Sequence, residues 1–173
     1  MNVKNNRRRR ESIEKIEKVF IELIQENELD RISVSDICKR AELNRSTFYA
    51  NFVDIYDLAD KVKAHLEDEF LKLFAPEIEQ KKRTNGYTKL FRHIQENQLF
   101  YKTYFKLGDI KMDIVGFDME AAEKYFGLKH IDYHIEFFKN GFNAIVRKWL
   151  NGGCVETPEE MNRILVSEYI REF

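Results

Sequence analysis

The sequence is poor in glycine and proline, the residues that most often interrupt helices and form turns. Only 7 glycines and 2 prolines occur among the 173 residues, whereas average usage would make the two together roughly 12% of the chain. A β-sandwich or barrel needs many turns, and turns draw on both residues. This scarcity therefore disfavours those folds and favours long helices.

Cysteines and long apolar runs are also scarce. Cys38 and Cys154 are the only cysteines; neither lies in a CxxC pair, and two cannot form a disulfide framework. No apolar stretch approaches the roughly 18 residues that a membrane-spanning helix requires. The basic N-terminus is followed by glutamates rather than by the apolar stretch of a signal peptide. We therefore expect a soluble, cytoplasmic protein with no membrane segment.

The chain has no large excess of either charge, because 29 Lys and Arg face 30 Asp and Glu. Taken alone, this balance argues against a nucleic-acid-binding protein. The distribution is uneven, however: residues 1–52 hold 11 Lys and Arg against 9 Asp and Glu, a net +2, which leaves −3 for the remainder. This mild asymmetry has the sign expected of an N-terminal DNA-binding region.

Apolar residues recur at helical spacing almost throughout, so the sequence predicts an all-α fold. A long pattern from Asp54 is expected to stop before Pro76, and residues 109–128 are the least clear part. A hydroxyl cap followed by a carboxylate three residues later predicts helix starts at Ser33 and Thr157. The expected helices are 9–27, 34–40, 45–51, 54–74, 87–95, 98–107, 131–151 and 158–172.

Two short helices joined by a tight turn occupy residues 33–52. This is the helix-turn-helix arrangement, in which the second short helix enters the major groove of DNA. That helix combines polar residues at its start with apolar Phe48 and Phe52 for packing. A plain helical corner in an all-α protein is the alternative interpretation of the same pattern.

The stretch from Ile32 to Phe52, ISVSDICKRAELNRSTFYANF, resembles the DNA-binding region of TetR/AcrR-type transcriptional regulators. Its distinctive features are Thr47-Phe48-Tyr49-x-x-Phe52 and the preceding Asp36-Ile37-x-x-x-Ala41. The resemblance is specific over residues 10–60 and implies a three-helix DNA-binding domain, 1–53. A helical C-terminal domain, 54–173, would provide ligand binding and dimerisation.

The resemblance also implies which residues contact DNA. Arg45 stands at the start of the recognition helix, where it could donate two hydrogen bonds to a guanine. Residues 7–10 form an arginine run that either reaches DNA as an N-terminal arm or is a disordered, solubilising tail. The predicted DNA-binding residues are Ser33, Ser35, Arg45, Ser46, Thr47, Tyr49 and Asn51, with Arg7, Arg8, Arg9 and Arg10 as the possible arm.

Two positions depart from the family pattern. Glu42 replaces the glycine usually found in the turn, so the turn must adopt a conformation that a residue with a side chain tolerates at some cost. Ile55 stands where many members have a lysine directed at a phosphate, which should weaken anchoring at the start of the fourth helix.

The family resemblance places the dimer interface and the effector site in the C-terminal helices. A two-fold dimer binding a palindromic operator is expected, because one short recognition helix contacts few base pairs. For each interface or aromatic residue, a place in the core is the alternative. The expected interface is Ile135, Phe138, Phe142, Ile145, Trp149, Ile164 and Leu165. The expected walls of a pocket for an unknown small-molecule effector are Phe91, Tyr101, Tyr104 and Phe105.

Nothing in the sequence indicates an enzyme, because nucleophile-elbow, phosphate-loop and HExxH motifs are all lacking. No cofactor or metal is expected; the pair His130 and His134 lacks further ligands, and Cys38 occupies a packing position rather than that of a redox sensor. We therefore predict a ligand-responsive repressor that binds double-stranded operator DNA. The alternative is an activator or coactivator acting through protein partners.

Overall fold

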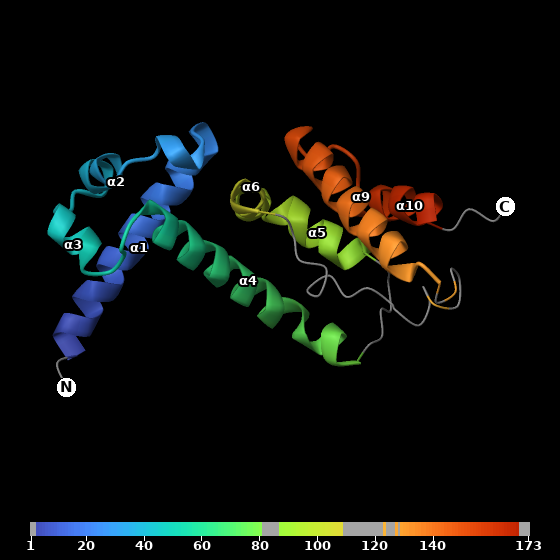
Figure 1. Ribbon diagram of the computed structural model, residues 1–173, viewed down its shortest axis with the longest axis horizontal. Coiled ribbons are helices and arrows are strands. Elements are labelled where there is room, and N and C mark those ends of the chain that lie inside the picture. The colour runs from blue at the N-terminus through green and yellow to red at the C-terminus, as the bar shows by residue number, and fades with distance from the viewer. Residues whose placement is uncertain (1–2, 81–86, 109–122, 124–126, 128, 170–173) are drawn as a thin grey trace. The chain divides into compact units, whose positions relative to one another are not determined.

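The computed structural model describes residues 3–80, 87–108, 123, 127 and 129–169. These residues divide into two compact units, 1–68 and 69–173, with the division inside one long helix. All regular structure in the described ranges is helical (Figure 1), which confirms the predicted all-α class. None of the helices in these ranges is both long and apolar enough to cross a membrane.

The first unit contains four α-helices and a short 3-10 turn. They are α1 (Val3–Glu26), η1 (Leu29–Arg31), α2 (Val34–Ala41), α3 (Arg45–Tyr49) and the start of α4 (Ile55–Gln80). The apolar stripe of α1 is buried, as its three- and four-residue spacing requires. The core of this unit contains Ile16, Phe20, Ile24, Ile37, Phe48, Leu58 and Val62.

The long helices α1 and α4 both extend beyond the predicted boundaries. Helix α1 begins at Val3 rather than near residue 9, so it includes the whole arginine run. Arg7 pairs with Glu11 at 3.1 Å and Arg10 pairs with Glu14 at 3.6 Å. Ion pairs between residues four positions apart stabilise a helix. Helix α4 continues to Gln80, so the prediction that Pro76 ends it was wrong.

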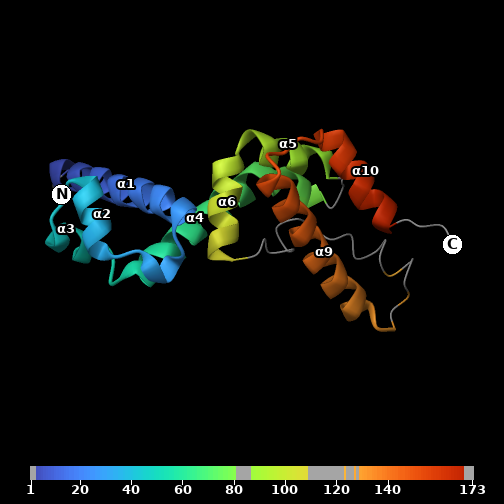
Figure 2. The same cartoon turned by 90° about the horizontal axis from the view of Figure 1, so that it is seen from above.

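The described part of the second unit is built from α5 (Thr88–Glu96), α6 (Gln98–Leu107), α9 (Ile131–Asn151) and α10 (Pro158–Tyr169), besides the end of α4. Helices α5 and α10 pack side by side, as Figure 2 also shows. Aromatic rings fill this core: Phe91 lies 6.1 Å from Phe142 and 5.5 Å from Trp149, measured between ring centroids.

The helix signals read from the sequence at the α9–α10 connection are confirmed. Gly153 adopts φ 83° after α9, and the Cys154 N–H donates to the Trp149 carbonyl at 2.9 Å, which satisfies the helix end. At the next start, the Thr157 N–H donates to Glu160 Oε2 at 2.8 Å and the Glu160 N–H donates to Thr157 Oγ1 at 3.2 Å. This reciprocal capping box holds the pKa of Glu160 below its usual value, chiefly through the backbone bond from Thr157.

Candidate nucleic-acid interface

The turn between α2 and α3 shows how the chain accommodates Glu42 in place of glycine. Glu42 adopts φ 55° and ψ 44°, the left-handed region, immediately after α2. The Leu43 N–H donates to the Cys38 carbonyl at 2.9 Å and the Glu42 N–H to the Lys39 carbonyl at 3.4 Å. These bonds form a Schellman motif, which normally has glycine at the left-handed position. The turn therefore places a residue with a side chain where glycine is preferred, at a conformational cost.

Replacing Glu42 with glycine is expected to stabilise the protein. A residue with a Cβ loses roughly 1 kcal/mol or more in the left-handed region, and glycine removes that cost. The free energy of unfolding should rise by about 1 kcal/mol in a urea titration. Glu42→Ala is the matched control, because it removes the carboxylate and keeps the Cβ. Equal stability of the Gly and Ala variants would show that the backbone conformation is not the cause.

Helix α3 is held by its apolar side and presents its polar side to solvent. Phe48 is fully buried, and its ring lies 5.5 Å from Tyr49 and 5.4 Å from Phe52, between centroids. Arg45 and Ser46 are exposed and Tyr49 is 57% exposed, while Thr47 is half-buried. The fold thus brings the three exposed residues together on one short helix.

The side chain of Arg45 is already oriented in the free protein. Arg45 Nη2 donates to Ser35 Oγ at 3.0 Å, which joins the recognition helix to α2. Ser33 has a local role instead: its hydroxyl accepts the Asp36 N–H at 3.1 Å and donates to the Asp36 carboxylate. Ser35 therefore positions the predicted base-contacting arginine, and Ser33 caps α2.

Asn51 connects three segments rather than pointing freely outward. Its Oδ1 accepts from Arg9 Nε at 2.8 Å, and its Nδ2 donates to the Thr47 carbonyl at 2.8 Å. Its own carbonyl accepts from Lys61 Nζ at 3.1 Å. Residues 7–10 thus belong to helix α1, and Arg9 in that helix contacts Asn51 just after α3.

The start of α4 is fixed by hydrogen bonds to the residues just before it. The Asp57 N–H donates to Asp54 Oδ1 at 2.8 Å, and the Val53 N–H donates to Asp57 Oδ2 at 2.8 Å. The hydrogen bond from Lys61, with that from Val53, lowers the pKa of Asp57. Ile55, which replaces the family's lysine, is buried and serves packing.

Two exposed residues near this start were missed by the sequence analysis. Val53 is 76% exposed and Tyr56 is 59% exposed. The available signal was that Tyr56 falls outside the buried series of Ile55, Leu58 and Val62. A tyrosine hydroxyl can donate to a phosphate oxygen, which makes Tyr56 a candidate for a backbone contact with DNA.

Four of the seven expected interface residues are buried within the second unit, the alternative left open for each of them. Phe138, Phe142, Trp149 and Leu165 are all at most 3% exposed, because they face the interior of their own unit. Ile135 and Ile145 are half-buried, and Ile164 is 42% exposed. The large apolar side chains that remain exposed on α9 are Tyr133 and Phe137.

The four expected pocket residues lie mostly in the core. Phe91, Tyr101 and Tyr104 are buried, and Phe105 is half-buried beneath Arg147, 5.0 Å from its ring centroid. Tyr101 Oη lies 2.7 Å from His93 Nδ1, and burial raises the pKa of this tyrosine. The packing of Phe91 against Phe142 and Trp149 favours the core interpretation for that ring.

Cys38 and the pair His130 and His134 are the other groups that the sequence offered as candidate sensors. Burial raises the pKa of the Cys38 thiol, which disfavours the reactive thiolate. His130 adopts φ 65° just before α9, with its ring 6.1 Å from Tyr133. Across the described ranges, no group of three or more potential metal ligands comes together.

A short helix with exposed polar residues, packed within a unit of four α-helices and followed along the chain by a second helical unit, is the arrangement of helix-turn-helix regulators. The chain also matches the family model TetR_C_8, described as a transcriptional regulator C-terminal region, over residues 81–167. The chain belongs to the TetR family of transcriptional regulators, which is not a family of enzymes. The predicted family is thereby confirmed.

One curated relative is the HTH-type dhaKLM operon transcriptional activator DhaS of Lactococcus lactis subsp. lactis (strain IL1403). It is 31% identical over 121 residues, a match that spans 64% of this chain and 63% of the relative. A solved structure, named dihydroxyacetone kinase operon activator DhaS, aligns with a TM-score of 0.48 and 24% identity. That alignment covers 91% of this chain and 93% of the other.

Proposed function

We propose that this regulator binds a palindromic operator as a homodimer and reads it with α3. The observation that carries the proposal is the exposed group Arg45, Ser46 and Tyr49 on a helix anchored by fully buried Phe48. A guanidinium can donate two hydrogen bonds to the major-groove edge of guanine, and hydroxyls can donate to phosphates. Residues 1–53 would bind DNA, and 54–173 would regulate and dimerise.

Helix α1 supports this proposal because it places positive charge near Asn51, which follows α3. Arg9 bonds Asn51, and the exposed Arg8 makes no side-chain ion pair in the part of the chain that the structure describes. An ordered helix loses less conformational entropy on binding than a flexible arm. Arg8 is therefore the residue of the run that we assign to the phosphate backbone.

The dimer would form through the outward face of α9. Tyr133 and Phe137 are 71% and 79% exposed, and Gly141 and Ala144 follow on the same face at helical spacing. A Cβ added at Gly141 would meet nothing within 4 Å, so glycine there leaves room for a neighbouring helix. Large exposed aromatics beside small residues suit helix–helix contact, and exposed Ile164 on α10 adds an apolar residue.

DNA binding is tested by selecting a duplex from a random-sequence library and then measuring affinity against salt. If several lysines and arginines neutralise phosphates, affinity should fall roughly a thousandfold or more between 50 and 200 mM salt. The selected sequence should be an inverted repeat, and a scrambled duplex of equal length is the control. Equal affinity for both duplexes would contradict sequence-specific recognition and favour action through protein partners.

The direction of regulation has two candidates. Ligand-relieved repression is our sequence-based prediction, whereas the name of the Lactococcus relative specifically favours activation. A promoter–reporter strain distinguishes them, because deletion of the regulator raises expression under a repressor and lowers it under an activator. In either case an effector of the second unit can act only if it binds the DNA-competent and DNA-incompetent states with different affinity.

A further inference from the structure

The first unit contains a hollow that neither the recognition helix nor the dimer proposal uses. It lies between the end of α1, η1 and α2 and has a volume of about 490 Å³. Pockets that bind small molecules fall in this size range. We call it the α1–α2 pocket; it is lined by Leu23, Asn27, Arg31, Ile32, Asp36, Lys39 and Arg40.

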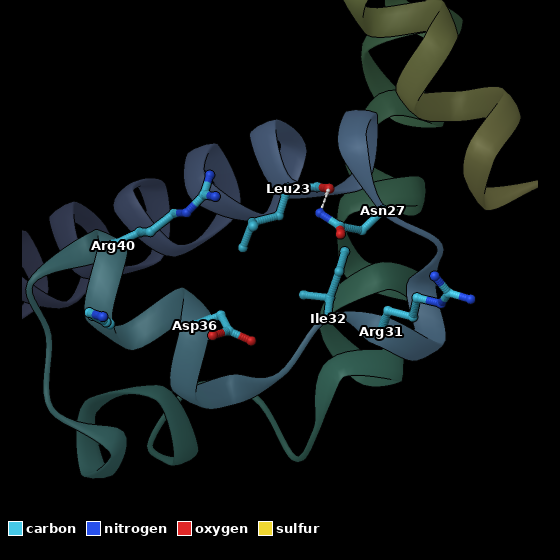
Figure 3. A pocket seen from close by; sticks show the side chains of 7 residues that line it. Leu23, Asn27, Arg31, Ile32, Asp36 and Arg40 are labelled. Carbon is cyan, nitrogen blue, oxygen red and sulfur yellow. Dashed lines mark hydrogen bonds between the residues drawn. The ribbon is translucent and has the colours of Figure 1, made fainter.

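The α1–α2 pocket combines an apolar floor with a positively charged rim. Figure 3 shows Leu23 and Ile32 at its centre, with Arg31 and Arg40 on opposite sides. Leu23 and Ile32 are only 5% and 6% exposed, so they form an apolar floor. The three cationic side chains are exposed, which makes a positively charged rim.

The charge balance of this rim favours an anion. The side chains of Arg31 and Lys39 make no hydrogen bond or ion pair within the described ranges, while Arg40 Nη2 lies 3.8 Å from Glu26 Oε2. The one lining carboxylate, Asp36, accepts a hydrogen bond from Ser33 in the α2 cap. The rim therefore carries two cations whose side chains have no partner in the part of the chain that the structure describes, against one carboxylate that already accepts a hydrogen bond.

We propose that the α1–α2 pocket binds a small organic anion, an apolar body carrying a carboxylate or a phosphate. The body would cover Leu23 and Ile32, and the oxyanion would accept hydrogen bonds from Arg31 and Lys39. Because the ligand would bridge η1 and α2, its binding would change the orientation of α2 and alter operator affinity. That regulatory step rests on the proposed DNA-binding function; the binding step does not.

Binding is tested on the free protein by calorimetry with phenyl phosphate and benzoate, which separate phosphate from carboxylate preference. Inorganic phosphate lacks the apolar body, and benzylamine carries the opposite charge. We expect one or both aromatic anions to bind, inorganic phosphate to bind at least tenfold more weakly, and benzylamine not to bind. Equal binding of benzylamine, or no binding of either aromatic anion, would overturn the proposal.

The R31Q/K39Q double variant tests whether the anion binds in the α1–α2 pocket. Losing two exposed charge contacts should weaken binding of the preferred anion about fivefold or more. K18Q is the matched control, because Lys18 is an exposed cation on α1 outside the pocket, and it should change binding less than twofold. An equal loss in both variants would show diffuse charge attraction instead of a site. If the anion binds and leaves operator affinity unchanged, the proposed regulatory step is wrong, whereas the proposed binding step is supported.

Discussion

Phe137→Glu is expected to convert the dimer into monomers without destabilising the fold. Phe137 is 79% exposed, so its replacement removes almost no packing inside the chain. At a dimer interface two copies of this aromatic residue would be lost and two like charges introduced. A central aromatic residue contributes roughly 2 kcal/mol or more to an interface, so the dissociation constant should rise roughly a thousandfold. Analytical ultracentrifugation over a concentration series measures it.

Phe138 is the matched control, because the adjacent side chain points inward and is 3% exposed. Within the monomeric Phe137→Glu background, adding Phe138→Ala should lower the free energy of unfolding by about 3–5 kcal/mol. Using one background keeps association out of the stability measurement. An unchanged dimer in the Phe137→Glu variant would move the interface away from this face of α9.

Arg45→Ala is expected to abolish discrimination at one base pair of each half-site. A bidentate arginine–guanine contact contributes roughly 1–3 kcal/mol of discrimination, and a palindrome contains two such contacts. The free energy of operator binding should therefore weaken by roughly 2–6 kcal/mol, while that of binding to scrambled DNA changes far less. Gel-shift titrations on the operator and on single-base variants measure both quantities.

Ser35→Ala refines this test through the bond from Arg45 Nη2 to Ser35 Oγ. If Ser35 positions the guanidinium, its removal should relax specificity at the same base pair that Arg45→Ala affects. If Ser35 contacts phosphate instead, affinity should fall for every sequence alike. Lys18→Ala removes one exposed positive charge from α1 and controls for general electrostatics. An Arg45→Ala variant with unchanged base preference would contradict the assignment of α3.

Local features were predicted well because their causes lie within a few residues. The Thr157–Glu160 box and the glycine end of α9 depend on neighbours three to five positions apart. The existence of the short helix α3 and the burial of Phe48 likewise follow from the adjacent pattern. The same holds at Glu42: a tight turn with some conformational cost was expected, and the left-handed backbone of Glu42 is where that cost arises.

Features that depend on distant segments could not be read from spacing. Asn51 has a side chain suited to DNA, yet Arg9, 42 positions earlier in the sequence, donates to it. Phe137 and Phe138 are the same residue type on one helix, and only packing in three dimensions decides which is buried. The α1–α2 pocket similarly requires α1, η1 and α2 to meet around it.

By itself, the sequence determined that this chain is helical, where most of its helices begin and end, and which short helix we propose to read DNA. Hydrophobic periodicity and capping depend on residues that are close together in the sequence, so they can be recognised from the sequence alone. The tertiary structure decided that the arginine run is helical and that Arg9 of this run bonds to Asn51. It also decided that four expected interface residues form core, and that a cation-rimmed pocket lies in the first unit. Burial and side-chain pairing depend on which distant surfaces meet, and periodicity along a single helix does not specify that.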